Sequence, residues 1–189
     1  MLDIHSPSPA IPLAKLFNMD TPSELAIVTG AIGSGKSTWC EKVAKRYQEA
    51  GHVVAGFISI ADFSANRKVG IDLVDLGSGE RRRLAEAQHE GSSVLMTDDW
   101  SFDAETLAWG NNSLQRLGPC DLFILDELGP LEFRRNEGLQ EGFQVIERRQ
   151  YRWAIVVVRP SLISQALLRW PGTQVFEICE VGREYDTYP

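Results

Sequence analysis

Short apolar runs alternate with longer amphipathic segments along most of the 189-residue chain. The runs have the length and aliphatic content of buried strands, and they fall at 25–29, 53–58, 121–125, 154–158 and 175–178. After the first run, apolar residues recur with the i, i+3, i+4, i+7 spacing of a helix that buries one face, at Cys40, Val43, Ala44 and Tyr47. Gly51 stands where such a helix would end. This order predicts an α/β domain with a mainly parallel sheet.

The middle of the chain departs from this alternation. Residues 69–76 and 81–85 have the pattern of two strands joined by the tight turn Gly77-Ser78-Gly79. They predict a β-hairpin inserted into the α/β frame. The run Arg81-Arg82-Arg83 in the second strand is either part of a phosphate path or, as charge runs at strand edges more often are, a solvated edge.

Three further helices are predicted after the hairpin. The first is N-capped by Asp103 and runs to about Leu117. The second buries apolar positions within 139–146 and ends near the basic pair Arg148-Arg149. The third is N-capped by Ser161 and stops before Pro171.

The first 23 residues differ from the rest in composition. Four prolines lie there among small polar residues, around one apolar patch at 11–17. This composition predicts an N-terminal extension, either loosely ordered or docked on the domain through the patch. Residues 24–189 are expected to form a single domain.

Composition and charge narrow the function classes. The net charge of -7 argues against a general nucleic-acid or membrane-surface binder. No apolar run approaches the roughly 20 residues needed to span a bilayer, and the N-terminus lacks the basic-then-apolar pattern of a secretion signal, so we expect a cytoplasmic location. Cys40, Cys120 and Cys179 are widely spaced in apolar surroundings, which predicts buried thiols and neither a disulfide framework nor a zinc site.

The glycine-rich stretch at 30–37 reads GAIGSGKS and fits the phosphate-binding pattern G-x-x-x-x-G-K-[ST]. It stands between a predicted strand and a predicted helix, as that pattern requires. Its glycines let the backbone come close to a phosphate, and its N–H groups form an anion nest with the helix N-terminus. The expected nucleotide-binding residues are Gly30, Ala31, Ile32, Gly33, Ser34, Gly35, Lys36, Ser37 and Thr38. Lys36 would reach the β- and γ-phosphates, and the Ser37 hydroxyl would bind Mg²⁺.

Two carboxylates, Asp126 and Glu127, end the apolar run at 121–125. Open α/β sheets bind their ligands at the carboxyl ends of the strands. Asp126 is therefore a candidate for holding Mg²⁺ through water, and Glu127 for orienting or deprotonating an attacking water. Arg159 follows the run at 154–158 and should project toward the same edge, where it either stabilises the γ-phosphate or pairs with a surface acid.

These landmarks resemble those of the small P-loop nucleoside triphosphatases, the family that includes the cancer-related nucleoside triphosphatase. The resemblance runs from about Leu25 to Arg183 and includes the 30–37 loop, Gly56-Phe57 and Arg159. Its most specific part is the run DELGPLE at 126–132, which is similar to that family's signature D-E-[IL]-G-x-[ML]-E. The resemblance implies a three-layer α/β fold related to recombinases and ATPases. It also implies slow, Mg²⁺-dependent hydrolysis of nucleoside triphosphates with loose base preference.

The leading hypothesis is a phosphohydrolase that converts ATP, GTP or other nucleoside triphosphates to the diphosphate and phosphate. In this hypothesis the catalytic residues are Lys36, Glu127 and Arg159, while Ser37 and Asp126 hold Mg²⁺. Two alternatives stay open. One is a nucleoside or nucleotide kinase whose phosphate lid is formed by Arg134, Arg135, Arg148 and Arg149. The other is a nucleotide-gated interaction module in which slow hydrolysis times contact with a partner protein.

Overall fold

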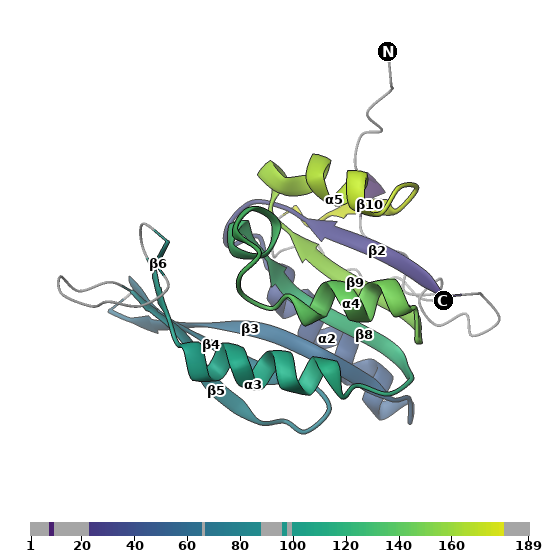
Figure 1. The fold of residues 1–189 in the computed structure, drawn as a ribbon, viewed down its shortest axis with the longest axis horizontal. Helices are drawn as coiled ribbons and strands as arrows, with labels where there is room; N and C mark the ends of the chain where they lie inside the picture. Colours follow the sequence, from purple (N-terminus) through teal and green to yellow (C-terminus); the bar gives the residue numbers. More distant parts are fainter. Residues whose placement is uncertain (1–7, 10–22, 66, 88–95, 98–99, 180–189) are drawn as a thin grey trace, which may run out of the picture.

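The computed structural model describes residues 8–9, 23–65, 67–87, 96–97 and 100–179. Its strands, labelled as in Figure 1, are β1 (Ser8–Pro9), β2 (Glu24–Thr29), β3 (Val54–Ser64), β4 (Arg67–Asp75), β5 (Arg81–Ala87), β6 (Met96–Thr97), β7 (Trp100–Phe102), β8 (Cys120–Leu128), β9 (Tyr151–Val158) and β10 (Gln174–Glu177). Its α-helices are α2 (Lys36–Glu49), α3 (Ala104–Gln115), α4 (Glu141–Arg148) and α5 (Ile163–Arg169). A π-helical turn at Leu131–Arg135 and a 3-10 turn at Pro160–Leu162 complete the described elements.

The strands form one sheet in the order β1-β10-β2-β9-β8-β3-β4-β5-β7-β6. Across the sheet in this order, neighbouring strands are parallel from β1 as far as β3. From β3 to the β6 edge, neighbouring strands are antiparallel. The mainly parallel sheet with a hairpin is therefore confirmed. In Figure 1 the antiparallel part extends as a wing to the left of the parallel part.

Helices cover both faces of the parallel strands. On one face, α2 packs against β3 and β8, and its buried residues Cys40, Val43, Ala44 and Tyr47 join one core cluster with residues of the parallel strands. On the other face, α3, α4 and α5 cover a second core cluster that includes Leu107, Phe143 and Trp170. The result is the expected three-layer arrangement, because a parallel sheet must bury both faces.

The termini of two predicted helices confirm the sequence interpretation. Gly51, with φ +80°, follows the end of α2. The Asp103 carboxylate caps α3 by accepting a hydrogen bond from the Thr106 N–H at 2.6 Å. The cap predicted at Ser161 is wrong: this residue lies inside the 3-10 turn, and the residue before α5 is Leu162, which makes no side-chain cap.

The hairpin is part of a longer antiparallel wing than the sequence predicted. β3 pairs with β8 only as far as Phe57 with Leu125, then continues to Ser64 alongside β4. This second half was missed because it has no continuous apolar run, and its residues are partly or fully exposed. In the buried first half of β3, Gly56 has φ +100°, and a Cβ there would lie 2.0 Å from the Ile124 carbonyl oxygen of β8. Only glycine lets the two strands approach this closely.

At the opposite edge, β1 pairs in parallel with β10 through Ser8–Pro9 and Phe176–Glu177. The predicted apolar patch at 11–17 lies outside the described residues. The division into an extension at 1–23 and a domain at 24–189 therefore stays a prediction. Among the described residues, no helix is long and apolar enough to cross a bilayer.

Candidate active site

The loop after β2 has the backbone that its glycines predict. Gly30, Gly33 and Gly35 all have positive φ, at +145°, +79° and +90°. Gly35 directly precedes α2, so the loop leads from the buried strand into a helix N-terminus. Ile32 is 97% exposed at this loop, and Ser34 is buried within it. This strand, loop and helix have the geometry of a phosphate-binding site.

The Lys36 ammonium is folded back over the loop. Its Nζ donates to the carbonyl oxygens of Gly30 at 3.0 Å and Ala31 at 2.7 Å. The positive charge therefore lies at the loop. A bound phosphate would have to compete with these two carbonyls for the ammonium group.

Two buried hydroxyl groups beside the loop fit an anionic ligand. Thr29 Oγ1 and Ser34 Oγ are buried and have no hydrogen-bond partner among the described residues. Buried hydroxyls normally find a partner in protein, water or ligand. Ser37 and Thr38 lie in the first turn of α2, the former half-buried and the latter exposed.

Asp126 lies near the carboxyl end of β8 and is only 2% exposed. Its Oδ2 accepts the Ser59 N–H at 3.3 Å, and its carbonyl oxygen accepts the Ser59 hydroxyl at 2.5 Å. Ser59 stands just past the point where β3 and β8 stop pairing. Ser59 was not predicted as a site residue, because its only signal in the sequence is a serine two residues after Gly56-Phe57.

The donor set fits Mg²⁺, which prefers oxygen ligands and commonly takes one or two from protein and the rest from water and phosphate. The expected donors are the Asp126 carboxylate and the Ser37 hydroxyl group. In the described part of the chain, no group of three or more His, Cys, Asp and Glu side chains comes together as a dedicated metal cage.

The main chain of Glu127 and that of Arg159 both lie at the carboxyl edge of the sheet. Glu127 belongs to β8 between Asp126 and Leu128; the structure describes its main chain but not its side chain. Arg159 directly follows β9, which lies between β2 and β8, and its side chain is exposed. The phosphate loop, the two carboxylate residues and Arg159 therefore lie at the carboxyl ends of three adjacent parallel strands, as predicted.

A comparison with known proteins identifies the family. A family model described as NTPase matches residues 26–187. The chain belongs to this NTPase family. Among curated proteins, this NTPase is 30% identical over 140 residues to the nucleoside-triphosphatase THEP1 of Caldivirga maquilingensis, a match that covers 74% of this chain and 79% of that protein. It is 32% identical over 111 residues to THEP1 of Methanopyrus kandleri, covering 58% of this chain and 60% of that protein.

Two solved structures share the fold of this NTPase. A human cancer-related nucleoside triphosphatase matches with a TM-score of 0.65 and 22% identity, covering 85% of this chain and 91% of that one. THEP1 of Aquifex aeolicus matches with a TM-score of 0.61 and 15% identity, covering 84% and 92%. The resemblance inferred from sequence motifs is confirmed.

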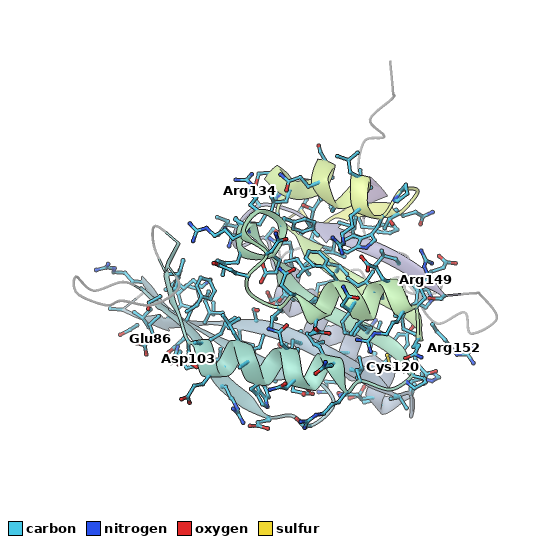
Figure 2. All side chains as sticks on the ribbon, viewed as in Figure 1. Glu86, Asp103, Cys120, Arg134, Arg149 and Arg152 are labelled. Atoms are coloured by element: carbon cyan, nitrogen blue, oxygen red, sulfur yellow. The ribbon has the colours of Figure 1, made fainter. Side chains whose placement is uncertain are left out.

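Two of the four arginines proposed for a kinase lid are far from the phosphate loop in this NTPase. Arg148 and Arg149 end α4 just before the amino end of β9, where Arg149 donates to the Ser23 carbonyl oxygen ahead of β2. Figure 2 shows Arg149 on the opposite side of the molecule from Arg134. The prediction that Arg148 and Arg149 close over phosphates is therefore wrong, because parallel strands place the start of β9 and the end of β2 at opposite edges.

The arginine run at 81–83 is held within the wing. Arg81 forms an ion pair with Asp72, and Arg83 pairs with both Asp72 and Asp62. Arg82 lies over the Trp109 ring, 4.5 Å from its centre. These pairs support the structural interpretation of the run over a phosphate path.

The cysteines only partly follow the prediction. Cys40 and Cys120 are buried, whereas Cys179 is exposed, so the expectation of a third buried thiol is wrong. Cys179 comes after the last residue of β10, beyond the strand's buried positions. Burial, with a contribution from the Asp126 carboxylate, raises the pKa of the Cys40 thiol well above its usual range. Cys40 is therefore a neutral core residue beneath the site.

Proposed function

We propose that this protein hydrolyses nucleoside triphosphates to nucleoside diphosphate and phosphate in the presence of Mg²⁺. The observation that carries the proposal is the placement of a phosphate loop after β2 and the Asp126–Glu127 pair at the end of β8, two parallel strands that are separated by β9 and end at the same sheet edge. Phosphoryl transfer depends mainly on positioning and on electrostatic stabilisation, which such an edge can supply. The names of the THEP1 relatives support the same activity.

Each part of the site has a proposed role. The N–H groups of residues 30–38 bind the phosphates, and Lys36 moves from the Gly30 and Ala31 carbonyl oxygens onto the β- and γ-phosphates. Ser37 and Asp126 hold Mg²⁺, which would neutralise developing charge on the phosphate oxygens. Ser59 fixes the Asp126 carboxylate in place.

Glu127 is the proposed base that orients and deprotonates the attacking water. Arg159 is the proposed cation that offsets charge on the γ-phosphate. We further propose a cytoplasmic location, an N-terminal extension at 1–23 outside the catalytic domain, and no role for membranes or nucleic acid.

Phosphate release from a panel of nucleoside triphosphates with Mg²⁺ tests the activity. We expect the parent protein to hydrolyse several of them, Lys36→Ala to be inactive, and Glu127→Gln to bind ATP but release phosphate at least about a hundredfold more slowly. Equal background release by the parent protein and Lys36→Ala would remove the hydrolase proposal. A parent-like rate in Glu127→Gln would show that Glu127 is not the base.

The same assay separates hydrolysis from the kinase alternative. Of the proposed lid only Arg134 and Arg135 remain; both are exposed and lie in the π-helical turn after β8. We expect added nucleosides and nucleoside monophosphates neither to stimulate nucleotide turnover nor to become phosphorylated. A nucleotide-gated interaction module would instead show a large, saturable rate increase when a partner protein is added.

A further inference from the structure

Glu132 is a buried carboxylate in the segment that follows the proposed reaction centre. It lies in the π-helical turn after β8 and is only 7% exposed. Its Oε2 accepts the Gly129 N–H at 2.8 Å, and its Oε1 accepts the Leu139 N–H at 3.0 Å. Burial of a carboxylate is costly unless hydrogen bonds compensate it, and both of these bonds are buried. Glu132 therefore ties together the two ends of residues 129–139, a segment we call the clasp.

The clasp is built around this carboxylate. Gly138 has φ +76°, and a Cβ there would lie 2.0 Å from Glu132 Oε1. The Gln140 side-chain amide donates to the carbonyl oxygens of Glu132 at 3.1 Å and Glu137 at 2.7 Å. Asn111 of α3 donates to the Gly138 carbonyl oxygen at 2.8 Å. The far end of the clasp is thus fixed to the body of the domain, which gives Glu132 a firm support.

The near end of the clasp lies two residues after Glu127. The β8–β9 ladder is irregular between Leu125 and Leu128, so Glu127 stands in a bulge and not in a regular ladder. Bulges redirect the side chains that they carry. The main-chain position of Glu127 then depends on how the chain is held immediately after the bulge, at Gly129.

We propose that Glu132 is a positioning residue for nucleotide hydrolysis: it fixes the main chain at Gly129 and thereby holds the main chain of Glu127, the proposed base, in place for water activation. This rests on the proposed function, in which Glu127 is the base. Glu132 acts through Glu127 and does not itself take the proton.

Glu132→Gln tests the proposal with little change of shape. The NH2 group of glutamine must face one of the two N–H donors that now share the carboxylate. We expect kcat for ATP to fall by about tenfold to a hundredfold, because a small misplacement of a reacting group is enough for such a loss. The Kd for ATP, measured by calorimetry on the full chain with Mg²⁺, should change by less than about twofold.

Glu137→Gln is the matched control. It removes the same charge from the same clasp, but Glu137 Oε2 is buried with no hydrogen-bond partner in the described ranges of the chain. We expect its kcat to stay within about twofold of the parent value. A loss equal to that of Glu132→Gln would overturn the proposal, since charge alone would then explain both variants.

A double-mutant cycle with Glu127→Gln separates positioning from general damage. Single-turnover hydrolysis of radiolabelled ATP should show that Glu132→Gln slows the parent but adds no further loss in the Glu127→Gln background. The same loss in both backgrounds would refute the proposal, because Glu132 would then act independently of Glu127. A parent-like rate in Glu127→Gln alone would instead refute the assignment of the base, so the two failures are distinguishable.

Urea unfolding accompanies each variant to show that it is folded. If Glu132→Gln does not fold, Gly138→Ala replaces it in the cycle, because the added methyl group displaces Glu132 Oε1 while the carboxylate is retained. The expected result is the same: a loss of kcat in the parent and none in the Glu127→Gln background. Additive losses would again refute the proposal.

Discussion

Gly30 is the position where one added methyl group tests the phosphate loop most directly. Its φ is +145°, and a Cβ there would lie 2.5 Å from the Ile178 carbonyl oxygen and 2.8 Å from Ser34 Oγ. Ile178 is itself held by its N–H bond to the Thr29 carbonyl oxygen at 2.9 Å. The carbonyl group therefore cannot move away cheaply, and Gly30→Ala should displace the start of the loop.

Gly33→Ala provides the matched comparison in the same loop. Gly33 also has positive φ, +79°, but a Cβ there would meet nothing within 4 Å. Its substitution should cost only backbone strain, about 1–2 kcal/mol of unfolding free energy. Gly30→Ala adds steric overlap, worth about 1–3 kcal/mol, to similar strain, for a total of about 2–5 kcal/mol.

Equilibrium urea unfolding without nucleotide measures both free energies, and titration with ATP measures binding. We expect Gly30→Ala to be the less stable variant and to bind ATP at least about tenfold more weakly, because the displaced N–H groups no longer converge on phosphate. Equal unfolding free energies for the two variants would refute the reasoning. They would mean that the contact with Ile178 does not constrain the loop.

Three further predictions concern other parts of the structure. Ser59→Ala removes the hydroxyl bond to the Asp126 carbonyl oxygen, so the Mg²⁺ concentration for half-maximal hydrolysis should rise about threefold or more; an unchanged Mg²⁺ titration would contradict this. Asp103→Ala should lower the unfolding free energy by about 1 kcal/mol, as the loss of other N-caps does, whereas Asp103→Asn should keep most of the stabilisation by the cap. Urea unfolding measures both variants. Burial, with help from Asp121, raises the pKa of Tyr47 from 10.0 to about 12. As pH rises, the Tyr47 phenol therefore loses its proton in the unfolded chain before it does so in the folded chain. The unfolding free energy that this group contributes should be retained below pH 10 and lost as pH rises toward 12. Urea unfolding at a series of pH values should show a smaller fall in unfolding free energy for Tyr47→Phe than for the parent protein.

Local sequence patterns predicted the elements whose chemistry is local. The buried face of α2, the glycines of the phosphate loop and the Asp103 cap are each determined by residues within a few positions of one another. The run from 121 to 125 predicted β8 because a strand buried on both faces leaves a continuous apolar signal.

Patterns failed where a partner distant in sequence determines the structure. The outer half of β3 is a strand because β4 pairs with it, although its own residues are largely polar or exposed. Ser161 has a typical capping side chain, yet the chain after β9 makes a 3-10 turn there. The lid proposed for Arg148 and Arg149 failed because neither composition nor spacing shows which edge of the sheet a residue occupies.

For this NTPase the sequence alone determined the class of fold, the phosphate loop and the acidic pair after a buried strand. These follow from side-chain chemistry at short spacing, which the folded chain does not alter. Only the tertiary structure decided which groups hold that machinery in place, namely Ser59 on Asp126 and Glu132 between Gly129 and Leu139. In these hydrogen bonds a carboxylate accepts from main-chain N–H groups whose position depends on strand pairing and loop closure. A main-chain N–H is the same in every residue except proline, so it leaves no signal in the sequence.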